Sequence, residues 1–235
     1  VIALLIGLLA PAISRAGASG RSMKCQSNLK QMAVAAQAYA ASFDSWPIAI
    51  RYASVNGVQH RYAWDWVTTA SGQLISPGAL WNFTDQPGEV HQCPEFTGAS
   101  TYAGDPHTGY NYNTTYLGAE GKVTGVIRRG APPHSCNRSS QCAMFGDGGW
   151  KAGANKYMRA PLRSEGLSLS MAALYSGGQA FRHAGSTNVC FVDGHVESRE
   201  KAFEGRLATS ALLQSQMGFP HNGFLSQDDW AYKPN

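Results

Sequence analysis

The sequence predicts an α+β fold in which a long N-terminal α-helix packs on an antiparallel β-sheet. Three observations predict it: an apolar run that continues into an amphipathic helical pattern, short apolar and aromatic runs separated by Gly, Pro, Asn and Asp, and a hairpin signal near the C-terminal end. We therefore divide the chain into a helix over residues 1–42 and an α+β head over residues 43–235, with loop-rich insertions and a C-terminal hairpin plus helix.

The first part of the predicted helix, residues 1–13, reads VIALLIGLLAPAI and carries no charge. A membrane-spanning helix needs about 20 such residues, so a signal-peptide core, a truncated membrane helix and a buried core helix all stay open for this run. Pro11 removes one backbone hydrogen bond, and we expect it to kink or loosen the helix.

The second part, residues 14–42, contains no proline and is rich in Ala, Lys, Gln, Met and Leu. Its apolar residues recur at spacings of three and four, which predicts one face packed against a partner. The helix therefore needs two environments: a bilayer or a protein bundle for its first part, and the chain's own head for its second. The predicted apolar face consists of Leu29, Met32, Ala33, Ala36 and Tyr39 or Ala40.

The clearest local signal in the head is the segment NVCFVDGHVESR, residues 188–199. It predicts two strands joined by a two-residue type I′ turn at Asp193-Gly194, where Gly194 takes a positive φ. After it, residues 201–217 predict a helix with Phe203, Leu207, Leu212 and Leu213 on its apolar face. Residues 61–67 fit a short helix or a strand equally well.

Charge and cysteine content narrow the function classes. The formal net charge of +4 is spread over the chain without a polybasic run, so we expect no nucleic-acid partner. The five cysteines include no CxxC pair, which argues against zinc-ribbon and thioredoxin-like sites. Cys136 and Cys142 bracket a short polar segment, and we expect them to form a disulfide in an oxidising compartment.

Several segments together resemble a known family. The helix sequence VIALLIGLLAPAISRA followed by CQSNLKQMAVAAQAYA, and His183 separated by nine residues from Asp193-Gly194, are similar to prepilin-processed type IV pilins and pseudopilins, especially the bacterial group with a C-terminal H-x9-DG motif. The segments HQCP (residues 91–94) and TGYNYN (residues 108–113) match that family as well.

This resemblance implies a structural subunit of an extracellular type IV pilus-like filament. Such a subunit inserts in the inner membrane, then self-associates into a helical homopolymer at the bacterial cell surface. The family's peptidase site and its Glu lie upstream of the run seen here, so we expect roughly ten further residues before Val1. The residues expected to form the assembly helix are Val1, Ile2, Leu4, Leu5, Ile6, Leu8, Leu9, Pro11 and Ile13.

The resemblance also bears on the remaining cysteines and on the motif. Cys25 and Cys93 are the family-like cysteines, and a disulfide between them would join the helix to the head, worth about 4 kcal/mol in the loop-entropy treatment. Cys190 fits a small buried residue of the hairpin strand. His183, Asp193, Gly194 and His195 are expected to be structural, with His183 bonded to the hairpin backbone.

Two alternative functions stay open at this stage. One is a minor pseudopilin of a type II secretion system. The other is a surface-anchored module that binds glycans through Trp46, Trp64, Trp66 and Trp81.

The sequence carries no GxSxG, HExxH, P-loop or GxGxxG motif, so we expect a protein that is not an enzyme. His183, Asp193, His195 and Asp147 would suit zinc by residue type, but the turn already accounts for Asp193 and the hairpin for His195, and we expect no metal. Calcium is the alternative, with oxygen ligands from Asp147, Asp228 and Asp229, although their spacing follows no EF-hand.

Overall fold

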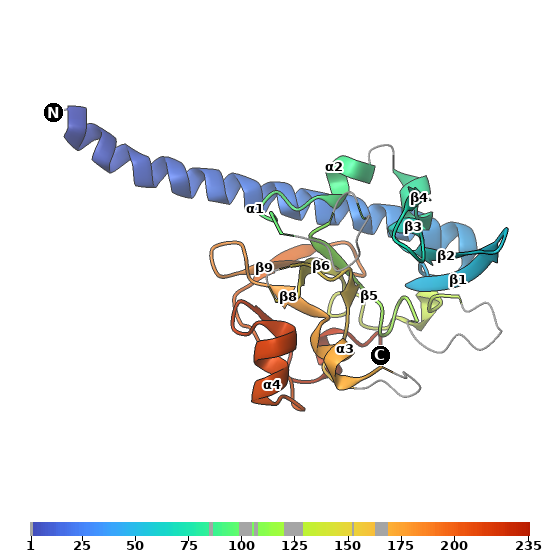
Figure 1. The fold of residues 1–235 in the computed structure, drawn as a ribbon. Helices are drawn as coiled ribbons and strands as arrows, with labels where there is room; N and C mark the ends of the chain where they lie inside the picture. The colour runs from blue at the N-terminus through green and yellow to red at the C-terminus, as the bar shows by residue number, and fades with distance from the viewer. Residues whose placement is uncertain are drawn as a thin grey trace.

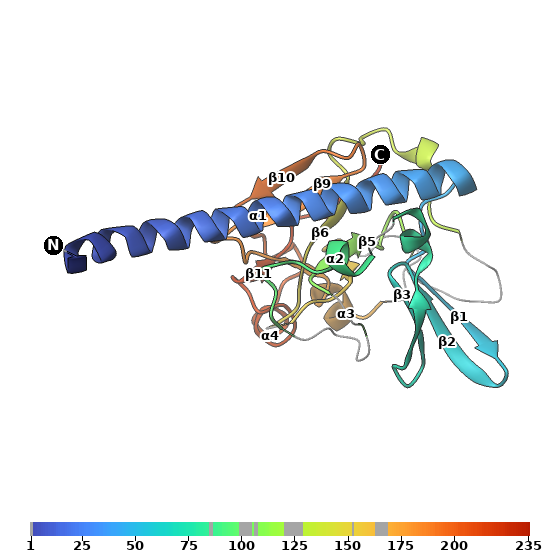
Figure 2. The same ribbon diagram turned by 90° about the horizontal axis from the view of Figure 1, so that it is seen from above.

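The computed structural model describes residues 2–84, 87–98, 105, 108–119, 129–151, 153–162 and 169–235. It has a long helix, α1 (Ile2–Phe43), whose C-terminal half lies across a head that contains antiparallel sheets. The N-terminal half of α1 projects away from the head (Figures 1 and 2). The predicted α+β class, with a long N-terminal helix on an antiparallel sheet, is confirmed.

The burial of α1 changes sharply along its length. From residue 9 to residue 17 every side chain is exposed, and full burial begins at Cys25. The helix runs unbroken through Pro11 and ends at Phe43, before the positive φ of Asp44. No helix in the described ranges is long and apolar enough to cross a membrane. The predicted apolar face is confirmed, since its buried residues include Leu29, Met32, Ala33, Ala36 and Ala40.

A β-sheet, which we term the β-arm, extends from the head beyond the end of α1 (Figure 2). Its strands are antiparallel neighbours in chain order, and Asn56 and Gly57, both at positive φ, form the two-residue turn between the first two. Residues 61–67, which fitted helix or strand, lie across the turn between its second and third strands. The strands are β1 (Ile50–Val55), β2 (Val58–Ala63), β3 (Trp66–Thr69) and β4 (Leu74–Pro77).

The body of the head is built on a second sheet with the order β10-β9-β6-β5-β7, and α1 packs on β9, β6 and β10. Its pairings are antiparallel except β5 with β7. β8 pairs with β6 and with β11. The strands are β5 (Tyr110–Asn113), β6 (Ala143–Gly149), β7 (Tyr157–Met158), β8 (Gly178–Ala180), β9 (Thr187–Phe191), β10 (Val196–Arg199) and β11 (Asn222–Gly223).

Short helices connect these strands. Two of them, η1 and α2, lie beside α1. The short helices are η1 (Ala79–Phe83), α2 (Pro87–His91), η2 (Pro133–Ser135), α3 (Met171–Tyr175), α4 (Ser210–Leu212), η3 (Leu213–Met217) and η4 (Asp229–Ala231).

The predicted hairpin is present as β9 and β10, but its turn differs from the expected type I′. The Phe191 N–H donates to the His195 carbonyl and the Gly194 N–H to the Phe191 carbonyl, so the loop holds three residues and not two. Gly194 has φ +88, whereas Asp193 does not have a positive φ. This is the three-residue loop in which Gly closes a type I turn in the left-handed region. The prediction for Gly194 is confirmed, and the prediction of a two-residue turn was wrong.

The helix predicted over residues 201–217 is shorter than expected. It begins at Ser210, with the Thr209 hydroxyl capping the Leu212 N–H, and ends at Gly218 in the left-handed region. Before it, Gly205 has φ +86, and Phe203 forms an isolated antiparallel bridge to Phe224. Residues 201–209 are thus irregular: Phe203 packs against the core, whereas Leu207 is 45% exposed.

Candidate functional site

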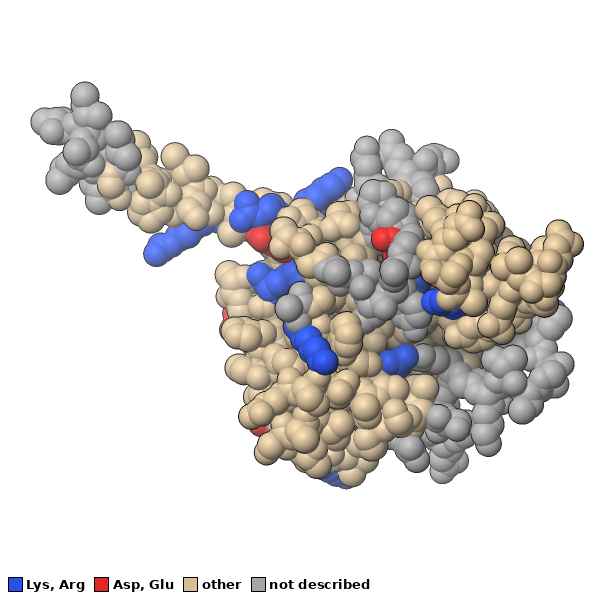
Figure 3. Space-filling model, viewed as in Figure 1, with Lys and Arg blue, Asp and Glu red and all other residues tan. Residues whose placement is uncertain are grey.

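The first candidate site is the projecting half of α1. The stretch from Ile2 to Lys24 is about 35 Å long at 1.5 Å per residue. Residues 9–17, near its middle, are all exposed and do not pack against the head. Leu9 is 56% exposed and Ile13 68% exposed, and Pro11 is also exposed. Figure 3 shows described surface without charge on the outer part of this projection, and basic side chains from its middle toward the head.

The other residues predicted for the assembly helix are only partly described. Val1 lies outside the described residues. The backbone of the following residues is helical, whereas their side chains lie outside what the structure describes: Ile2, Leu4, Leu5, Ile6 and Leu8.

The second candidate site is a buried cluster in which the packed half of α1 meets the head. It consists of Cys25, Cys93, Asp147 and His183, which we term the Cys–His–Asp cluster. Cys25 comes from α1, Cys93 from the segment after α2, Asp147 from β6, and His183 from the turn between β8 and β9. Cys25, Cys93 and Asp147 are fully buried, and His183 is 5% exposed.

The ligand atoms of the cluster all lie within 4.8 Å of one another. The Cys25 Sγ is 3.3 Å from Asp147 Oδ1, and the Cys93 Sγ is 3.7 Å from His183 Nε2. The same imidazole nitrogen lies 3.4 Å from Asp147 Oδ1. Each member therefore touches at least one other through the atom that would bind a metal.

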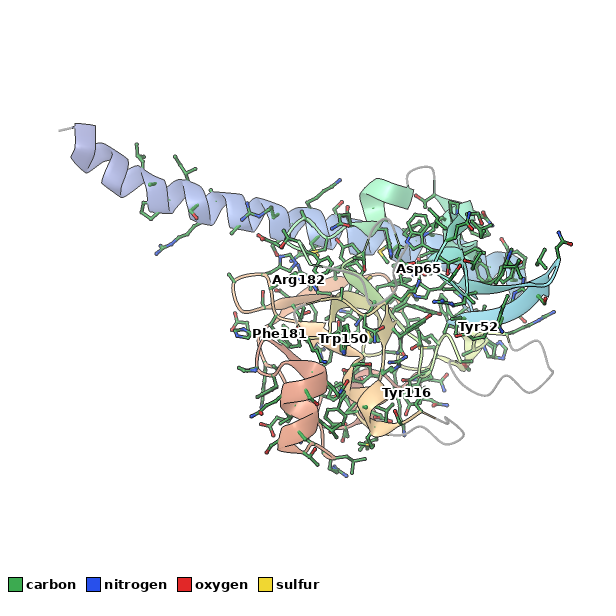
Figure 4. All side chains as sticks on the ribbon, in the orientation of Figure 1. Tyr52, Asp65, Tyr116, Trp150, Phe181 and Arg182 are labelled. Atoms are coloured by element: carbon green, nitrogen blue, oxygen red, sulfur yellow. The ribbon has the colours of Figure 1, made fainter. Side chains whose placement is uncertain are left out.

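Two neighbours fix the Asp147 carboxylate. The Asn188 N–H donates to Oδ2 at 2.8 Å, and the Arg182 guanidinium donates to Oδ1 at 3.3 Å. Arg182 also bonds the carbonyls of Gly109 and Gly148 and lies over the Phe96 ring. In Figure 4 the label of Arg182 lies beneath α1, at the same junction between helix and head. Asp147 is thus held in one orientation by groups from β9 and from the turn that precedes it.

The cluster perturbs the pKa values of its members in opposite directions. A hydrogen bond to Cys25, followed by one to His183, lowers the pKa of the Cys93 thiol to about 6 against the effect of burial. Burial raises the pKa of the Cys25 thiol far above its usual range. Burial would lower the pKa of His183, but its bonds to Asp147 and Cys93 raise it to about 9. Without a metal, these shifts favour a Cys93 thiolate beside a His183 imidazolium.

Such a thiolate–imidazolium pair resembles an activated nucleophile, yet Cys93 is inaccessible to a substrate because its side chain is fully buried. The donor set of two thiols, one imidazole and one carboxylate also suits a closed metal site. His183 was expected to bond the hairpin backbone. Its ring instead contacts Asp147 and Cys93, because the β8–β9 turn directs it into the junction with α1.

The other residues weighed as metal ligands are not brought together. Asp193 and His195 form a pair at the surface, with the His195 Nδ1 2.6 Å from the Asp193 carboxylate. For calcium, Asp147 belongs to the buried cluster, whereas Asp228 accepts the Trp230 N–H and Asp229 bonds the Tyr116 hydroxyl. The three carboxylates are thus engaged in separate contacts.

Neither expected disulfide is present, because each of the five cysteines, all in described ranges, is a free thiol. The expected neighbours are nevertheless correct. Cys25 and Cys93 meet in the cluster, and a hydrogen bond to Cys142 lowers the pKa of Cys136 to about 7. Cys190 is buried in β9, as expected. The sulfur atoms thus interact as hydrogen-bonded thiols and not as covalent bridges.

The four tryptophans considered for glycan binding are all in the interior. Trp46, Trp66 and Trp81 are each 4% exposed and Trp64 is 1% exposed. A stacking platform needs an accessible ring face, so these side chains do not form one. Three of the indole rings, those of Trp64, Trp66 and Trp81, surround His91 edge-on.

A second buried charge cluster lies beside these rings, and sequence reasoning missed it. The Lys156 ammonium lies 2.8 Å from the Asp65 carboxylate and 2.9 Å from that of Asp105, and His91 Nε2 lies 3.4 Å from Asp65. Figure 4 labels Asp65 where the β-arm meets the body of the head. No motif spacing relates these residues, and only the fold brings them together. We assign this cluster a structural role, since it joins the β-arm to the body.

Comparison with protein families identifies a family that the chain matches. A family described as "Protein of unknown function (DUF1559)" matches residues 15–147, more than half of the chain. The chain belongs to the DUF1559 family. The DUF1559 match covers the packed half of α1, the β-arm, Cys93 and Asp147, and it ends before His183. The chain has no match among curated proteins or solved structures.

Proposed function

We propose that the chain is a structural subunit of an exported, type IV pilus-like filament that assembles through the projecting half of α1. The observation that carries this proposal is the apolar, exposed helix on a head that is otherwise well packed. The DUF1559 family is associated with pilin-like, prepilin-type proteins, which agrees with it at a coarser level.

The projecting half of α1 exposes apolar side chains to water, which favours association. Burying one Leu or Ile side chain contributes about 1.5–3 kcal/mol relative to water, and Leu9 and Ile13 have no such environment within their own chain. A bundle of identical helices supplies one, with the heads on the outside. Before assembly the same segment rests in the inner membrane, where association depends on close packing at small residues such as Gly7 and Ala10.

The function as a surface filament is favoured over a glycan-binding module because the tryptophans of that alternative are buried. The partner in this proposal is a second copy of the chain, repeated helically.

A charge placed on the projecting helix tests the proposal. We expect Ile13→Asp to abolish filaments in electron micrographs of sheared cell-surface material, because a buried unpaired carboxylate opposes helix bundling. The thermal stability of the detergent-purified chain should not change, since the Ile13 side chain is exposed there.

The matched control is Val58→Asp, at a 48% exposed position next to the β1–β2 turn and away from α1. Filaments should persist in this variant. Filaments of normal length and abundance in Ile13→Asp would overturn the proposal.

A further inference from the structure

We propose that Cys25, Cys93, Asp147 and His183 bind one zinc ion, which fastens α1 to the head. The site is independent of the filament function, because every ligand lies within one chain. Three of the ligands belong to the head and one to the helix, so the ion would link the two.

Three of the six distances between ligand atoms match those of a tetrahedral zinc site, and all six are within 4.8 Å. With Zn–S bonds of about 2.3 Å and Zn–N or Zn–O bonds of about 2.0–2.1 Å, tetrahedral geometry places ligand atoms about 3.3–3.8 Å apart. The distances from Asp147 Oδ1 to Cys25 Sγ and to His183 Nε2 are 3.3 and 3.4 Å, and that from Cys93 Sγ to His183 Nε2 is 3.7 Å.

The donor types select zinc over calcium or magnesium. Two cysteine sulfurs and one imidazole are soft or borderline ligands, whereas calcium and magnesium take oxygen ligands. The four side chains are buried, as expected for a structural site closed to solvent. A disulfide between Cys25 and Cys93 would use the two sulfurs but would give no role to His183 and Asp147.

The charges around the site balance when zinc is bound. Two thiolates and one carboxylate carry three negative charges, and the ion carries two positive ones. Arg182, whose guanidinium lies 3.3 Å from Asp147, supplies the remaining positive charge. Binding would release the protons held by Cys25 and His183, since metal ligands bind in their deprotonated form.

The Asp147 carboxylate is oriented to bind the zinc ion. The Asn188 N–H donates to Asp147 Oδ2 at 2.8 Å, and both carboxylate oxygens face the cluster. Oδ1 lies 3.3 Å from Cys25 Sγ, and His183 Nε2 lies 3.2 Å from Oδ2 and 3.4 Å from Oδ1. Ligands of structural metals are commonly held in this way by a hydrogen bond to their other atom.

The experiment measures zinc in the full chain, purified in detergent with α1 intact, after dialysis against metal-free buffer. We expect one zinc per chain by elemental analysis. Replacement by Co²⁺ should give the intense visible absorption of a tetrahedral site and a near-ultraviolet thiolate-to-cobalt band. Both signals should be lost in Cys93→Ala and retained in Cys190→Ser, which alters a buried cysteine outside the cluster.

A second pair of variants separates ligation from folding. His183→Asn keeps a polar group but supplies a poor ligand, and it should lose the zinc. His183→Cys supplies another zinc ligand at the same place and should retain it. Equal metal content in the two variants would overturn the proposal.

Thiol titration of the denatured chain, with chelator and without reductant, distinguishes the disulfide. Zinc ligation predicts that all five cysteines react. Reaction of three, with Cys25 and Cys93 identified by peptide mass mapping as the two that do not react and with no metal bound, would identify a Cys25–Cys93 disulfide and overturn the proposal. Reaction of five with no bound zinc after reconstitution would leave a hydrogen-bonded cluster, and would overturn it as well.

Discussion

Lys156 shows how single buried charges decide stability in this head. Its ammonium is 3% exposed and sits between the carboxylates of Asp65 and Asp105. Burial alone would raise the pKa of Asp65, but the charges of Lys156 and His91 hold it below its usual value. Burial and the charge of Asp65 raise the pKa of Asp105. Removing one member leaves the others buried without compensation.

We therefore expect Lys156→Met to lower the free energy of unfolding by about 3–5 kcal/mol at neutral pH. The measurement is urea unfolding of the detergent-purified chain, followed by tryptophan fluorescence. Lys24→Met, at an exposed position of α1, is the control and should change stability by less than about 0.5 kcal/mol. Equal effects of the two substitutions would contradict the role assigned to Lys156.

The same variant should have a different pH dependence. In the wild type the lowered pKa of Asp65 stabilises the fold above about pH 4, the usual carboxyl value, and this stability is lost as the pH falls through the folded pKa. Without Lys156 the carboxyl groups of Asp65 and Asp105 are protonated more readily, so lowering the pH restores part of the lost free energy of unfolding. The stability difference between wild type and Lys156→Met should shrink from neutral pH toward about pH 4, as measured by unfolding at several pH values.

Residue-scale prediction from sequence succeeded where the constraint is local. Gly194 was predicted at positive φ and has it, because a tight hairpin requires that conformation whatever the rest of the chain does. His183 was singled out by its motif, but its partners were predicted wrongly. Asp147 on β6 and Cys93 after α2 come close to His183 only because the fold packs these segments together.

At the scale of elements, α1 changes near Cys25 from a projecting, exposed part to a part that packs on the head. The apolar spacing predicted its packed face, and the burial of Leu29, Met32 and Ala33 confirms it. By contrast, the same type of spacing over residues 201–209 predicted a helix that does not form, since Gly205 adopts a left-handed conformation there. In that segment the prediction from periodicity was wrong for both the helix and the burial of Leu207, which is 45% exposed.

Two adjacent positions on α1 test which face of the helix packs against the head. Ala33 is fully buried and Val34 is 57% exposed. We expect Ala33→Asp to cost about 3–4 kcal/mol, because it buries an unpaired carboxylate against the head. Val34→Asp should cost less than about 1 kcal/mol, since Val and Asp have similar helix propensities. Thermal unfolding of the detergent-purified chain measures both, and similar losses would contradict the assignment of faces.

At the scale of the whole molecule, the projecting helix should be more susceptible to proteolysis in the free chain than in the assembled filament. Arg15 is exposed on the projection, whereas Arg21 is paired with Glu95 at 2.6 Å. Isolated helix ends open locally with little cost, so limited trypsin treatment of the unassembled chain should cleave first after Arg15.

In isolated filaments we expect this cleavage to be slower, because neighbouring helices cover the segment. Mass spectrometry of the digestion products identifies the first site. Cleavage after Arg206, whose side chain is 66% exposed in the irregular segment before α4, serves as the internal reference. An unchanged ratio of the two cleavages would argue against burial of α1 in the assembly.

The sequence by itself determined the long helix with its apolar and amphipathic parts, the hairpin at Gly194, and the pairs of neighbouring cysteines. The helix, the hairpin and the Cys136–Cys142 pair follow from side-chain periodicity, turn chemistry and short spacing, which operate within short segments, whereas the Cys25–Cys93 pair followed from family resemblance. The tertiary structure alone decided that Cys25, Cys93, Asp147 and His183 converge, and that Lys156 lies between two carboxylates. The physical reason is that each of these clusters draws residues from distant segments, and only the packing of α1, the β-arm and the central sheet against one another brings those segments together.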